Sequence, residues 1–597
     1  MRLRAMRTAA GLMLALAIAA PALSQSLPSA NHIGRPVYDP ACATCHAAPA
    51  DSRTPEFAAL AGMSAGQLRD AIAEGGKMAA MAAALSDSEK LQLVTYLTSG
   101  QIQTAANWTD PIACASAKRG VDVAKPIASS GFGVDRTQTR RLTAAQSGLK
   151  KQDLRSLEIA WVIGFPGQGS GTGASIVGDT MFIAGGGRLL ALDTASGCAK
   201  WSIAASSRNT PAFGEMNGRA VLAFAAQQDV FVVDAKTGEN VWQASGQATD
   251  NVGTIRGGVV IYKDKIIVPI SASGVTAGIQ PKFECCIGHG AVVALSAKDG
   301  TKLWEYHTMP IAQYTGKVSS TGVRQRGPSG APIWSVPVID ETRNRVIVTT
   351  GENTSHPCTD TSDAIIALDL DTGKEVWKFQ ALAADIWNMA CVAASGAGPV
   401  PGPNCPWNVE GDTHSGRDFD FGAGAMIVKG AGGKDVVLAG QKSGDTWALD
   451  ADSGKLVWNV RFGEGTWLGG IHWGLSTDGE RLFAPINDPL FDAAPTSRRP
   501  GVFAVDIKTG ERLWGFDAKP NCAGERGKVV VNCASKYGFS AAPLTVDGAV
   551  IAATLGGEVL IVDGENGDVI NRLDTIGPHN TINGIAGKGG SIDSHAI

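Results

Sequence analysis

The sequence carries little charge and no strong bias of sign. Charged residues make up 18% of its 597 residues, and the formal net charge is −4. A chain without a basic surface is not expected to bind nucleic acid, because phosphate contacts need clustered Lys and Arg. The sequence also lacks a glycine-rich dinucleotide fingerprint between a strand and a helix, so it predicts no nicotinamide site.

Long apolar runs are absent apart from one near the N-terminus. Arg2, Arg4 and Arg7 precede an apolar run over residues 9–20. Small residues then follow as far as Ser24. These three parts are typical of a secretory signal, and the run is shorter than the ~20 residues that cross a bilayer as a helix. We therefore expect a signal peptide over 1–24, a periplasmic protein and no stable membrane insertion.

Glycine and cysteine are plentiful. The 74 glycines favour tight turns over long helices, and a chain of 597 residues exceeds one ordinary core, so we expect at least two domains. In an oxidising compartment the eleven cysteines should form disulfides unless they hold a cofactor. If two of them bind a cofactor, nine remain, and at least one of these, with Cys358 as the candidate, stays outside intrachain disulfides.

The stretch Cys42-Ala43-Thr44-Cys45-His46 has a specific chemistry. Two thiols at this spacing can form thioethers to haem, and the adjacent imidazole can bind its iron. A redox CxxC or half of a zinc site are the alternatives, but the βαβ setting of the first and the second ligand pair of the other are missing. We expect Cys42 and Cys45 to hold haem c covalently and His46 to bind the iron.

An electron-transfer haem usually has a methionine as its other axial ligand. Met78 and Met81 lie just before an apolar helix face. This order resembles small class I cytochromes c, and the spacing favours Met78, with Met81 as the alternative. We expect an all-α cytochrome c domain over 34–101, followed by a linker over 102–135.

From residue 157 onward one unit recurs along the chain. It consists of an apolar strand, a turn that is mostly of the form D-x-x-x-G, and a second strand that ends in Trp. Seven copies lie at 191–201, 232–242, 294–304, 367–377, 448–458, 504–514 and 561–571, the last with Asn571 in place of Trp. Each copy predicts a hairpin, and the spacing leaves room for about four strands per unit, which is one propeller blade.

The repeats resemble the blades of PQQ-dependent alcohol dehydrogenases, which carry a tryptophan at this position. Residues 131–161 are similar to the segment that opens their propeller. The resemblance covers 131 to the end and implies an all-β, eight-bladed PQQ-type propeller over 136–597. Seven repeats are complete, and 580–597 reads as the start of a last blade that is apparently incomplete.

The resemblance also implies a PQQ site. PQQ is a flat quinone with three carboxylates, so it needs an aromatic surface and cations. Trp334 corresponds to the stacking tryptophan, Lys442 to the basic residue beside the quinone, and Arg256 to a second cation. Ordinary core packing is the alternative for Trp334, and surface charge is the alternative for Lys442 and Arg256. Adjacent Cys285 and Cys286 can form the disulfide that family members place against PQQ, unless each pairs elsewhere.

A calcium ion accompanies PQQ in the family. Glu352 follows Trp334 at the interval of the family's ligand asparagine, and Asn353 is adjacent. Either residue offers oxygen, which Ca²⁺ prefers. Glu284 corresponds, with one extra residue before the next glycine, to the family's first calcium-ligand glutamate. We expect Glu284, Glu352 and Asn353 to bind Ca²⁺.

The catalytic base departs from the family pattern. In the stretch 383–391 the residue after Trp387 is Asn388, where the family has an aspartate. An amide cannot accept the proton of the substrate hydroxyl. Asp385 is the nearest carboxylate, and we expect it to act as the base.

Together these residues predict oxidation of a secondary alcohol by PQQ and Ca²⁺, with haem c passing single electrons to an external cytochrome c or a similar acceptor. An N-terminal haem combined with paired cysteines resembles the polyvinyl alcohol dehydrogenases, which implies an alcohol or polymer substrate. A quinohaemoprotein for other alcohols, sugars or aldehydes would share every motif. A non-catalytic propeller scaffold would share the repeats alone.

Overall fold

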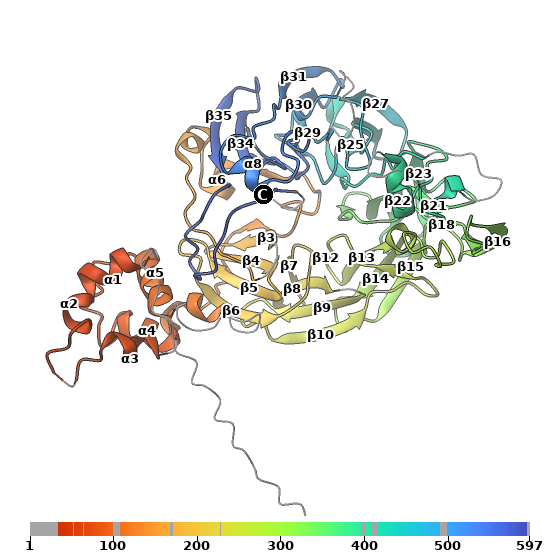
Figure 1. Ribbon diagram of the computed structural model, residues 1–597. Helices are drawn as coiled ribbons and strands as arrows, with labels where there is room; N and C mark the ends of the chain where they lie inside the picture. The colour runs from red at the N-terminus through yellow and green to blue at the C-terminus, as the bar shows by residue number, and fades with distance from the viewer. Residues whose placement is uncertain are drawn as a thin grey trace, which may run out of the picture.

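The computed structural model describes residues 34–593 except 52, 64, 99–107, 167–170, 227, 396–400, 409–415 and 490–497. The predicted signal peptide lies outside the described residues. Within the described part of the chain, no helix is long and apolar enough to cross a membrane. A small helical domain and a ring of β-sheets make up the molecule (Figure 1).

The helical domain contains five short helices, α1 (Arg35–Ala41), α2 (Ala43–His46), α3 (Phe57–Ala61), α4 (Ala65–Ile72) and α5 (Asp87–Thr98). Ser86 and Glu89 exchange hydrogen bonds at the start of α5, which satisfies backbone donors that the first turn leaves free. The apolar face of α5 packs on Tyr38 and Leu60 to form the core of the domain. The predicted all-α cytochrome c domain is confirmed.

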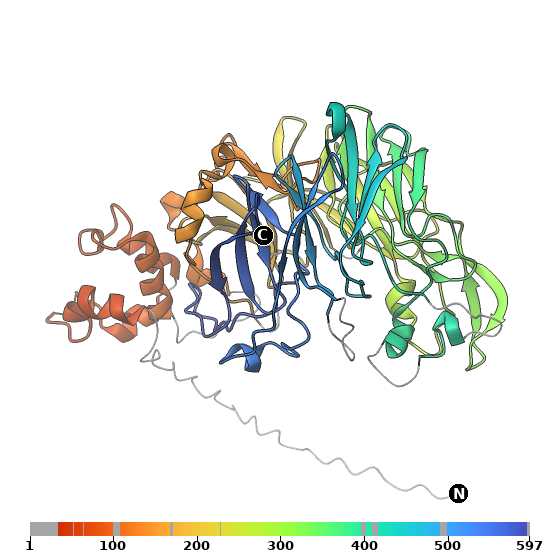
Figure 2. The same cartoon turned by 90° about the horizontal axis from the view of Figure 1, so that it is seen from above.

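The rest of the chain forms seven blades, each a sheet whose blade strands follow one another in antiparallel order from the ring axis outward, and two further two-stranded sheets lie outside the blades (Figures 1 and 2). Blade 1 contains β3 (Gly171–Val177), β4 (Thr180–Gly185), β5 (Arg188–Asp193) and β6 (Ala199–Ala204), and blade 2 contains β7 (Ala212–Met216), β8 (Arg219–Ala226), β9 (Asp229–Asp234) and β10 (Asn240–Ser245). Blade 3 contains β11 (Gly253–Thr254), β12 (Val260–Tyr262), β13 (Lys265–Ala272), β14 (Ala291–Ser296) and β15 (Lys302–His307). Blade 4 contains β19 (Val338–Asp340), β20 (Arg345–Thr349), β22 (Ala364–Asp369) and β23 (Glu375–Gln380).

Three further blades complete the seven. Blade 5 contains β24 (Met426–Lys429), β25 (Asp435–Gly440), β26 (Asp445–Asp450) and β27 (Leu456–Arg461). Blade 6 contains β28 (Ser476–Thr477), β29 (Arg481–Ile486), β30 (Gly501–Asp506) and β31 (Arg512–Asp517), and blade 7 contains β32 (Leu544–Val546), β33 (Ala549–Ala553), β34 (Glu558–Asp563) and β35 (Val569–Asp574). The seven predicted repeats are therefore seven blades, and buried apolar side chains fill the space between neighbouring blades.

Shorter elements connect or decorate the blades. They are β1 (Ile127–Ser129), β2 (Arg141–Leu142), β16 (Gln313–Val318), β17 (Arg324–Gly327), β18 (Ser329–Gly330), β21 (Asn353–Ser355), α6 (Ala144–Ser147), α7 (Gly274–Ala277), α8 (Arg526–Val529), η1 (Asp110–Ile112), η2 (Ser116–Lys118), η3 (Lys151–Ser156), η4 (Met389–Ser395), η5 (Pro406–Asn408) and η6 (Ala431–Gly433). β2 pairs in parallel with β32, so a segment that precedes blade 1 becomes a strand of blade 7.

The repeated tryptophan joins each blade to the next. In blade 1, Trp201 donates its indole N–H to the carbonyl of Ala235 in blade 2, and its ring fills the space where a Cβ on Gly238 would lie. Gly238 also has φ of 76°, which glycine adopts without strain. Trp304 and Gly373 repeat the arrangement between blades 3 and 4. The D-x-x-x-G turn and the Trp thus recur because each completes the other across a blade boundary.

The sector between blades 7 and 1 differs from the others. Trp161 donates to the carbonyl of Thr194 in blade 1 as the repeat tryptophans do, whereas Asn571 of blade 7 donates to the carbonyls of Leu154 and Leu157. The C-terminal segment joins here, with the N–H of Ile582 donating to Val162. Among the described residues this sector has no four-stranded sheet, so the eighth blade is represented by irregular segments.

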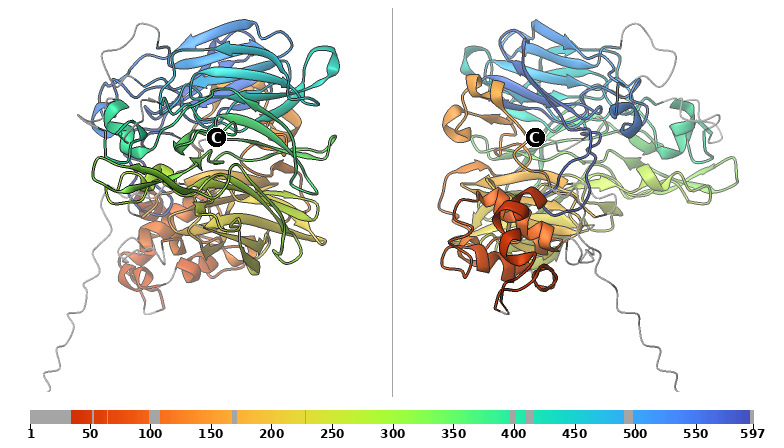
Figure 3. Two further views of the ribbon diagram at one scale, coloured as in Figure 1. Left: turned by 90° about the vertical axis from the view of Figure 1, so that its right-hand side faces the viewer. Right: turned by 60° about the vertical axis from the view of Figure 1, so that its left-hand side comes forward.

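The helical domain lies outside the ring, beside blade 1 (Figures 1 and 3). Arg69 donates to the carbonyls of Asp110 and Pro111 in η1, and Leu91 packs in one apolar cluster with this segment. A disulfide between Cys114 and Cys198 then fixes the segment to blade 1.

Candidate functional site

The haem motif surrounds α2. His46 is buried, and its Nδ1 lies 2.7 Å from the carbonyl oxygen of Pro55. A proton on Nδ1 leaves the Nε2 lone pair for a metal, which is the usual arrangement of an imidazole ligand. Cys42 and Cys45 are not in disulfides, so both thiols remain for thioether bonds.

The two methionine candidates differ in exposure. The Met81 side chain is 63% exposed, whereas Met78 is half-buried and its N–H donates to the carbonyl of Ala71 in α4. A ligand of a haem enclosed by the domain is expected on the more buried side chain. The geometry therefore favours Met78 over Met81.

Three buried carboxylates gather where blades 4 and 5 meet. Glu352 follows β20, and Asp418 and Asp420 precede β24. One oxygen from each lies within 4.8 Å of the others, an arrangement that could hold a metal ion. Neither carboxylate oxygen of Glu352 has a hydrogen-bond partner among the described residues. A buried carboxylate without a partner is costly, and a hard cation is a fitting neighbour for it.

Lys442 supplies the nearest positive charge. Its Nζ lies 2.9 Å from Asp418 and 3.2 Å from Asp420. Burial opposes the charge of this lysine, but the two aspartates outweigh burial and raise the pKa of Lys442. Burial also opposes ionisation of Asp420, yet Lys442 lowers the pKa of Asp420. One lysine does not balance three carboxylates. Burial, and after it the charge of Asp420, therefore raise the pKa of Glu352 well above its usual range.

Trp334 borders this cluster. Its indole N–H donates to Asp420 at 2.9 Å, and the Lys442 Nζ lies 5.3 Å from the centre of the ring. His472 and Trp473 meet the ring edge-on, with centroid separations of 5.8 and 4.9 Å. Trp334 is only half-buried. A supported aromatic ring next to a cation and a carboxylate cluster is suited to a flat anionic ligand.

The predicted pairing of Cys285 with Cys286 is confirmed, and both residues are fully buried. Asn388 lies against this disulfide, with its Nδ2 3.6 Å and 3.7 Å from the two sulfurs. The same amide donates to the carbonyl of Thr354, two residues beyond Glu352. Asn388, which occupies the position where an aspartate was expected, therefore supports the disulfide. As predicted, Cys358 is in no disulfide.

Asp385 organises the loop that carries the cluster. Its carboxylate accepts the backbone N–H groups of Arg417, Asp418 and Phe419, at 2.7, 3.3 and 2.8 Å. Burial raises the pKa of Asp385, and these hydrogen bonds oppose the rise. Both oxygens are thus occupied by the backbone.

Two residues expected to bind calcium do not join the cluster. Glu284 pairs with Arg324 and Arg326 at the β16–β17 hairpin and is 39% exposed. The Asn353 side chain accepts the N–H of Thr359 and donates to the carbonyl of Ser329, so it is occupied in a turn.

Arg256 is exposed and lies one residue before Gly257, which packs on the backbone of Ser335 next to Trp334. Partial burial and the neighbouring charge of Arg208 lower the pKa of Arg256. The two arginines thus lie close enough for their charges to interact. Arg208 was not predicted from the sequence.

The sequence reasoning also missed Asp418 and Asp420. Their signal is the stretch R-D-F-D-F-G-A-G at 417–424, in which two aspartates stand two residues apart just before an inner strand. In the structure Asp418 has a left-handed φ of 58°, so this segment is not a regular strand and the pair is not placed by strand alternation.

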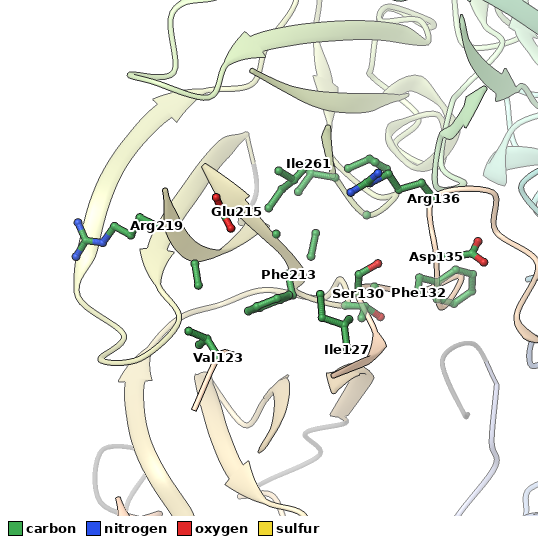
Figure 4. Close-up of a pocket in the computed structure, with 18 of the residues that line it drawn as sticks. Val123, Ile127, Ser130, Phe132, Asp135, Arg136, Phe213, Glu215, Arg219 and Ile261 are labelled. Atoms are coloured by element: carbon green, nitrogen blue, oxygen red, sulfur yellow. The ribbon is translucent and has the colours of Figure 1, made fainter. Parts of the chain in front are cut away.

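A cavity of about 510 Å³ lies elsewhere, between the segment 123–138 and the inner strands of blades 2 and 3 (Figure 4). Phe132, Phe213 and Ile261 line it. Its lining includes none of the carboxylates described above, and it reaches the segment of Trp334 only at Val336.

Comparisons with known proteins agree with this organisation. A family model described as "Outer membrane protein assembly factor BamB" matches residues 145–362 and 361–586. A second, described as "Cytochrome C oxidase, cbb3-type, subunit III", matches residues 29–97. The matches correspond to the ring and to the helical domain.

Curated relatives include two polyvinylalcohol dehydrogenases. That of Sphingopyxis sp. (strain 113P3) is 30% identical over 96% of this chain and 88% of its own, and that of a Pseudomonas species is 29% identical over 94% and 87%. Among solved structures, a europium-containing methanol dehydrogenase has a TM-score of 0.54 at 14% identity, covering 78% of this chain and 86% of its own. The quinohemoprotein alcohol dehydrogenase of Comamonas testosteroni has a TM-score of 0.52 at 16% identity, covering 82% and 78%. Given the blade repeats, the haem motif and these relatives, the chain belongs to the PQQ-dependent quinohaemoprotein alcohol dehydrogenase family.

Proposed function

We propose that this protein oxidises secondary alcohol groups, as in polyvinyl alcohol, to ketones in the periplasm, and passes the electrons through its haem c to an external cytochrome c or similar acceptor. The observation that carries the proposal is the unpartnered carboxylate of Glu352 beside Asp418, Asp420 and Trp334. A non-catalytic scaffold propeller would not need a buried carboxylate cluster whose negative charge Lys442 balances only in part. The polymer as substrate rests on the relatives at about 30% identity.

The residues present fit the cofactors. Glu352 and Asp420 would hold Ca²⁺ with Asp418 beside it, Trp334 would lie against PQQ, and Lys442, Arg256 and Arg208 would face its carboxylates and carbonyl. When bound, PQQ supplies a quinone carbonyl that is polarised by the metal and takes up the electrons of the alcohol. The buried Cys285–Cys286 disulfide, supported by Asn388, would form the opposite wall.

We assign the proton-accepting role to Asp418 in place of Asp385. Both oxygens of Asp385 accept backbone N–H groups. Asp418 accepts from Lys442 through one oxygen, and no N–H of a described residue donates to the other. A general base needs an oxygen within reach of the substrate hydroxyl. Burial raises the pKa of Asp418 well above its usual range, and Lys442 opposes this rise and so favours the ionised form of the base.

The metal has a second candidate. The three carboxylates, one charge of which Lys442 balances, offer hard oxygen ligands that suit a trivalent as well as a divalent ion, and one of the structural neighbours contains europium. A trivalent lanthanide is therefore a second candidate for this site. The chemistry assigned to the protein side chains is the same for both ions.

The decisive experiment is reduction of the intrinsic haem by alcohol. Purified protein is loaded with PQQ and either Ca²⁺ or Eu³⁺, and the haem absorbance is followed after adding polyvinyl alcohol, a small secondary alcohol, a sugar or an aldehyde. We expect haem reduction by alcohols, fastest with the polymer. If no alcohol reduces the haem of fully loaded protein, the proposal is wrong, and reduction by sugars alone would assign another substrate class.

The base assignment is tested by a matched pair. Asp418→Asn should slow haem reduction by about 10²–10⁴-fold, the usual contribution of general base catalysis, while PQQ absorbance is retained. Asp385→Asn keeps one acceptor oxygen for the loop but turns an NH2 group towards a backbone N–H, so it should slow haem reduction less than Asp418→Asn does. The reverse ranking would restore Asp385 as the base.

Cell fractionation with a periplasmic marker enzyme tests the location.

A further inference from the structure

A chain of hydrogen bonds links the rim of Trp334 to the C-terminal segment. The Nδ1 of His472 lies 2.8 Å from the hydroxyl of Ser540, and this hydroxyl donates to the carboxylate of Asp593 at 2.6 Å. His472 lies in the loop before β28, and Ser540 in the loop before β32. Three separate segments thus meet beside the aromatic ring of the proposed PQQ site.

The donor directions within this chain follow from the chemistry of its members. An ionised carboxylate only accepts, so the Ser540 proton is directed to Asp593. The Ser540 oxygen must then accept from His472, which requires the proton of the imidazole to be on Nδ1. The Nε2 of His472 is therefore left with a lone pair. Without Asp593, the Ser540 hydroxyl could donate to Nδ1 instead, and the opposite tautomer would form.

The surroundings keep this imidazole neutral. Ser540 is fully buried and His472 is 8% exposed, whereas the Asp593 side chain is 56% exposed. Burial lowers the pKa of His472 to about 4, with Lys442 acting in the same direction and Asp593 and Asp420 opposing it. The tautomer, and not the charge, is consequently the property that the hydrogen-bond chain controls.

We infer that Ser540 and Asp593 are positioning residues of the redox site. Together they fix His472 as the Nδ1–H tautomer against the edge of Trp334, so that the lone pair of Nε2, and no N–H, is available at the rim of the proposed cofactor surface. This inference rests on the proposed function for its consequence in catalysis. It also makes the C-terminal segment, which fills the irregular sector of the ring, a part of the site.

The tautomer can be measured without any turnover. In full-length protein labelled with ¹⁵N-histidine, the His472 signals are assigned by their loss in His472→Gln, and their nitrogen shifts report which nitrogen carries the proton. We expect Nδ1–H in the wild type and in Asp593→Asn, which keeps an acceptor oxygen. Ser540→Ala and Asp593→Ala should give a mixture of tautomers or the Nε2–H form.

The catalytic consequence is measured separately. Ser540→Ala and Asp593→Ala should lower kcat/KM for alcohol-dependent haem reduction about fivefold, the effect of one lost hydrogen bond, with PQQ content and reduction of the haem by ascorbate unchanged. Asp568→Ala, at an exposed turn of the same C-terminal part, is the control and should match the wild type.

These outcomes separate the inference from the proposed function. An unchanged His472 tautomer in Ser540→Ala would overturn the inference, as would an unchanged kcat/KM in a variant whose tautomer has changed. Absence of alcohol-dependent haem reduction in the loaded wild type would overturn the proposed function, whereas the tautomer result would still decide whether Ser540 and Asp593 control His472.

Discussion

The haem motif and the carboxylate cluster are built in opposite ways. Cys42, Cys45 and His46 lie within five consecutive residues around one helical turn. The cluster joins Glu352 of blade 4 to Asp418 and Lys442 of blade 5, and none of these is a neighbour of another in sequence. A local motif keeps its geometry as long as its helix forms, whereas the assembled site requires the blades to be in register.

Cysteine is also used differently in the helical domain and in the ring. In the helical domain, Cys42 and Cys45 are outside disulfides and are left for a cofactor. All four disulfides of the described residues lie in the ring or fix the linker to it, at Cys114–Cys198, Cys285–Cys286, Cys391–Cys405 and Cys522–Cys533. The comparison predicts that each region can be disabled while the other stays intact.

The largest effect is expected when the haem attachment site alone is removed. Replacing both cysteines, Cys42→Ser with Cys45→Ser, should abolish covalent haem, because no thioether can form. Haem staining after denaturing electrophoresis measures the loss. PQQ-dependent reduction of an artificial dye should continue in this variant, since the ring is unchanged. Covalent haem in the double variant would contradict the assignment of the motif.

The assembled site should be disabled by Glu352→Gln. Removing one buried ligand charge is expected to weaken metal binding by 10-fold or more and to slow alcohol-dependent haem reduction by about 10²–10³-fold. Metal titration by calorimetry and stopped-flow absorbance provide the two measurements. Glu284→Gln is the matched control, and equal losses in the two variants would return Glu284 to the metal site.

A third test concerns the blade contacts on which the assembled site depends. Trp377 is 8% exposed and donates to the carbonyl of Ala451, so Trp377→Ala should lower the free energy of unfolding of the ring by about 3–5 kcal/mol. Denaturant unfolding is followed by tryptophan fluorescence for the ring and by haem absorbance for the helical domain. Only the transition followed by tryptophan fluorescence should shift. The exposed neighbour Val376→Ala should shift neither.

The smallest expected effect is on acid stability. Burial, assisted by His307, lowers the pKa of His289 in blade 3 to about 4 from an ordinary value near 6.5. The unfolded chain therefore binds a proton that the folded ring excludes, and the ring loses up to about 3 kcal/mol as pH falls from 6.5 to 4. His289→Gln should remove this part of the pH dependence of the melting temperature. An identical pH profile in the variant would show that His289 protonates freely.

Much of the fold could be predicted because its signals are local. The pair of Trp201 and Gly238 has an equivalent at each boundary from blade 1 to blade 7, since the tryptophan fills the space that the glycine leaves. The closing sector was not predictable in detail. Asn571 replaces the tryptophan there and binds the backbone at Leu154, in a segment with no repeat pattern.

Prediction of the ring site was partial for a physical reason. Trp334, Glu352 and Lys442 could be predicted because each stands in a stretch of sequence that resembles the PQQ-dependent alcohol dehydrogenases. Asp418 lies at the end of an insertion after β23, and only the folded loop returns it to Glu352. Glu284 occurs in the expected order along the chain, but arginines of the inserted β16–β17 hairpin hold it away from the cluster.

The parallel pairing of β2 with β32 has a consequence for biosynthesis. Arg140, next to β2, donates to the carbonyl of Pro543, 403 residues later in the chain. The earliest strand partner of blade 7 is therefore translated long before blade 7 itself. When the first six blades have been synthesised, β2 still lacks its partner β32, and only the later synthesis of blade 7 closes the ring.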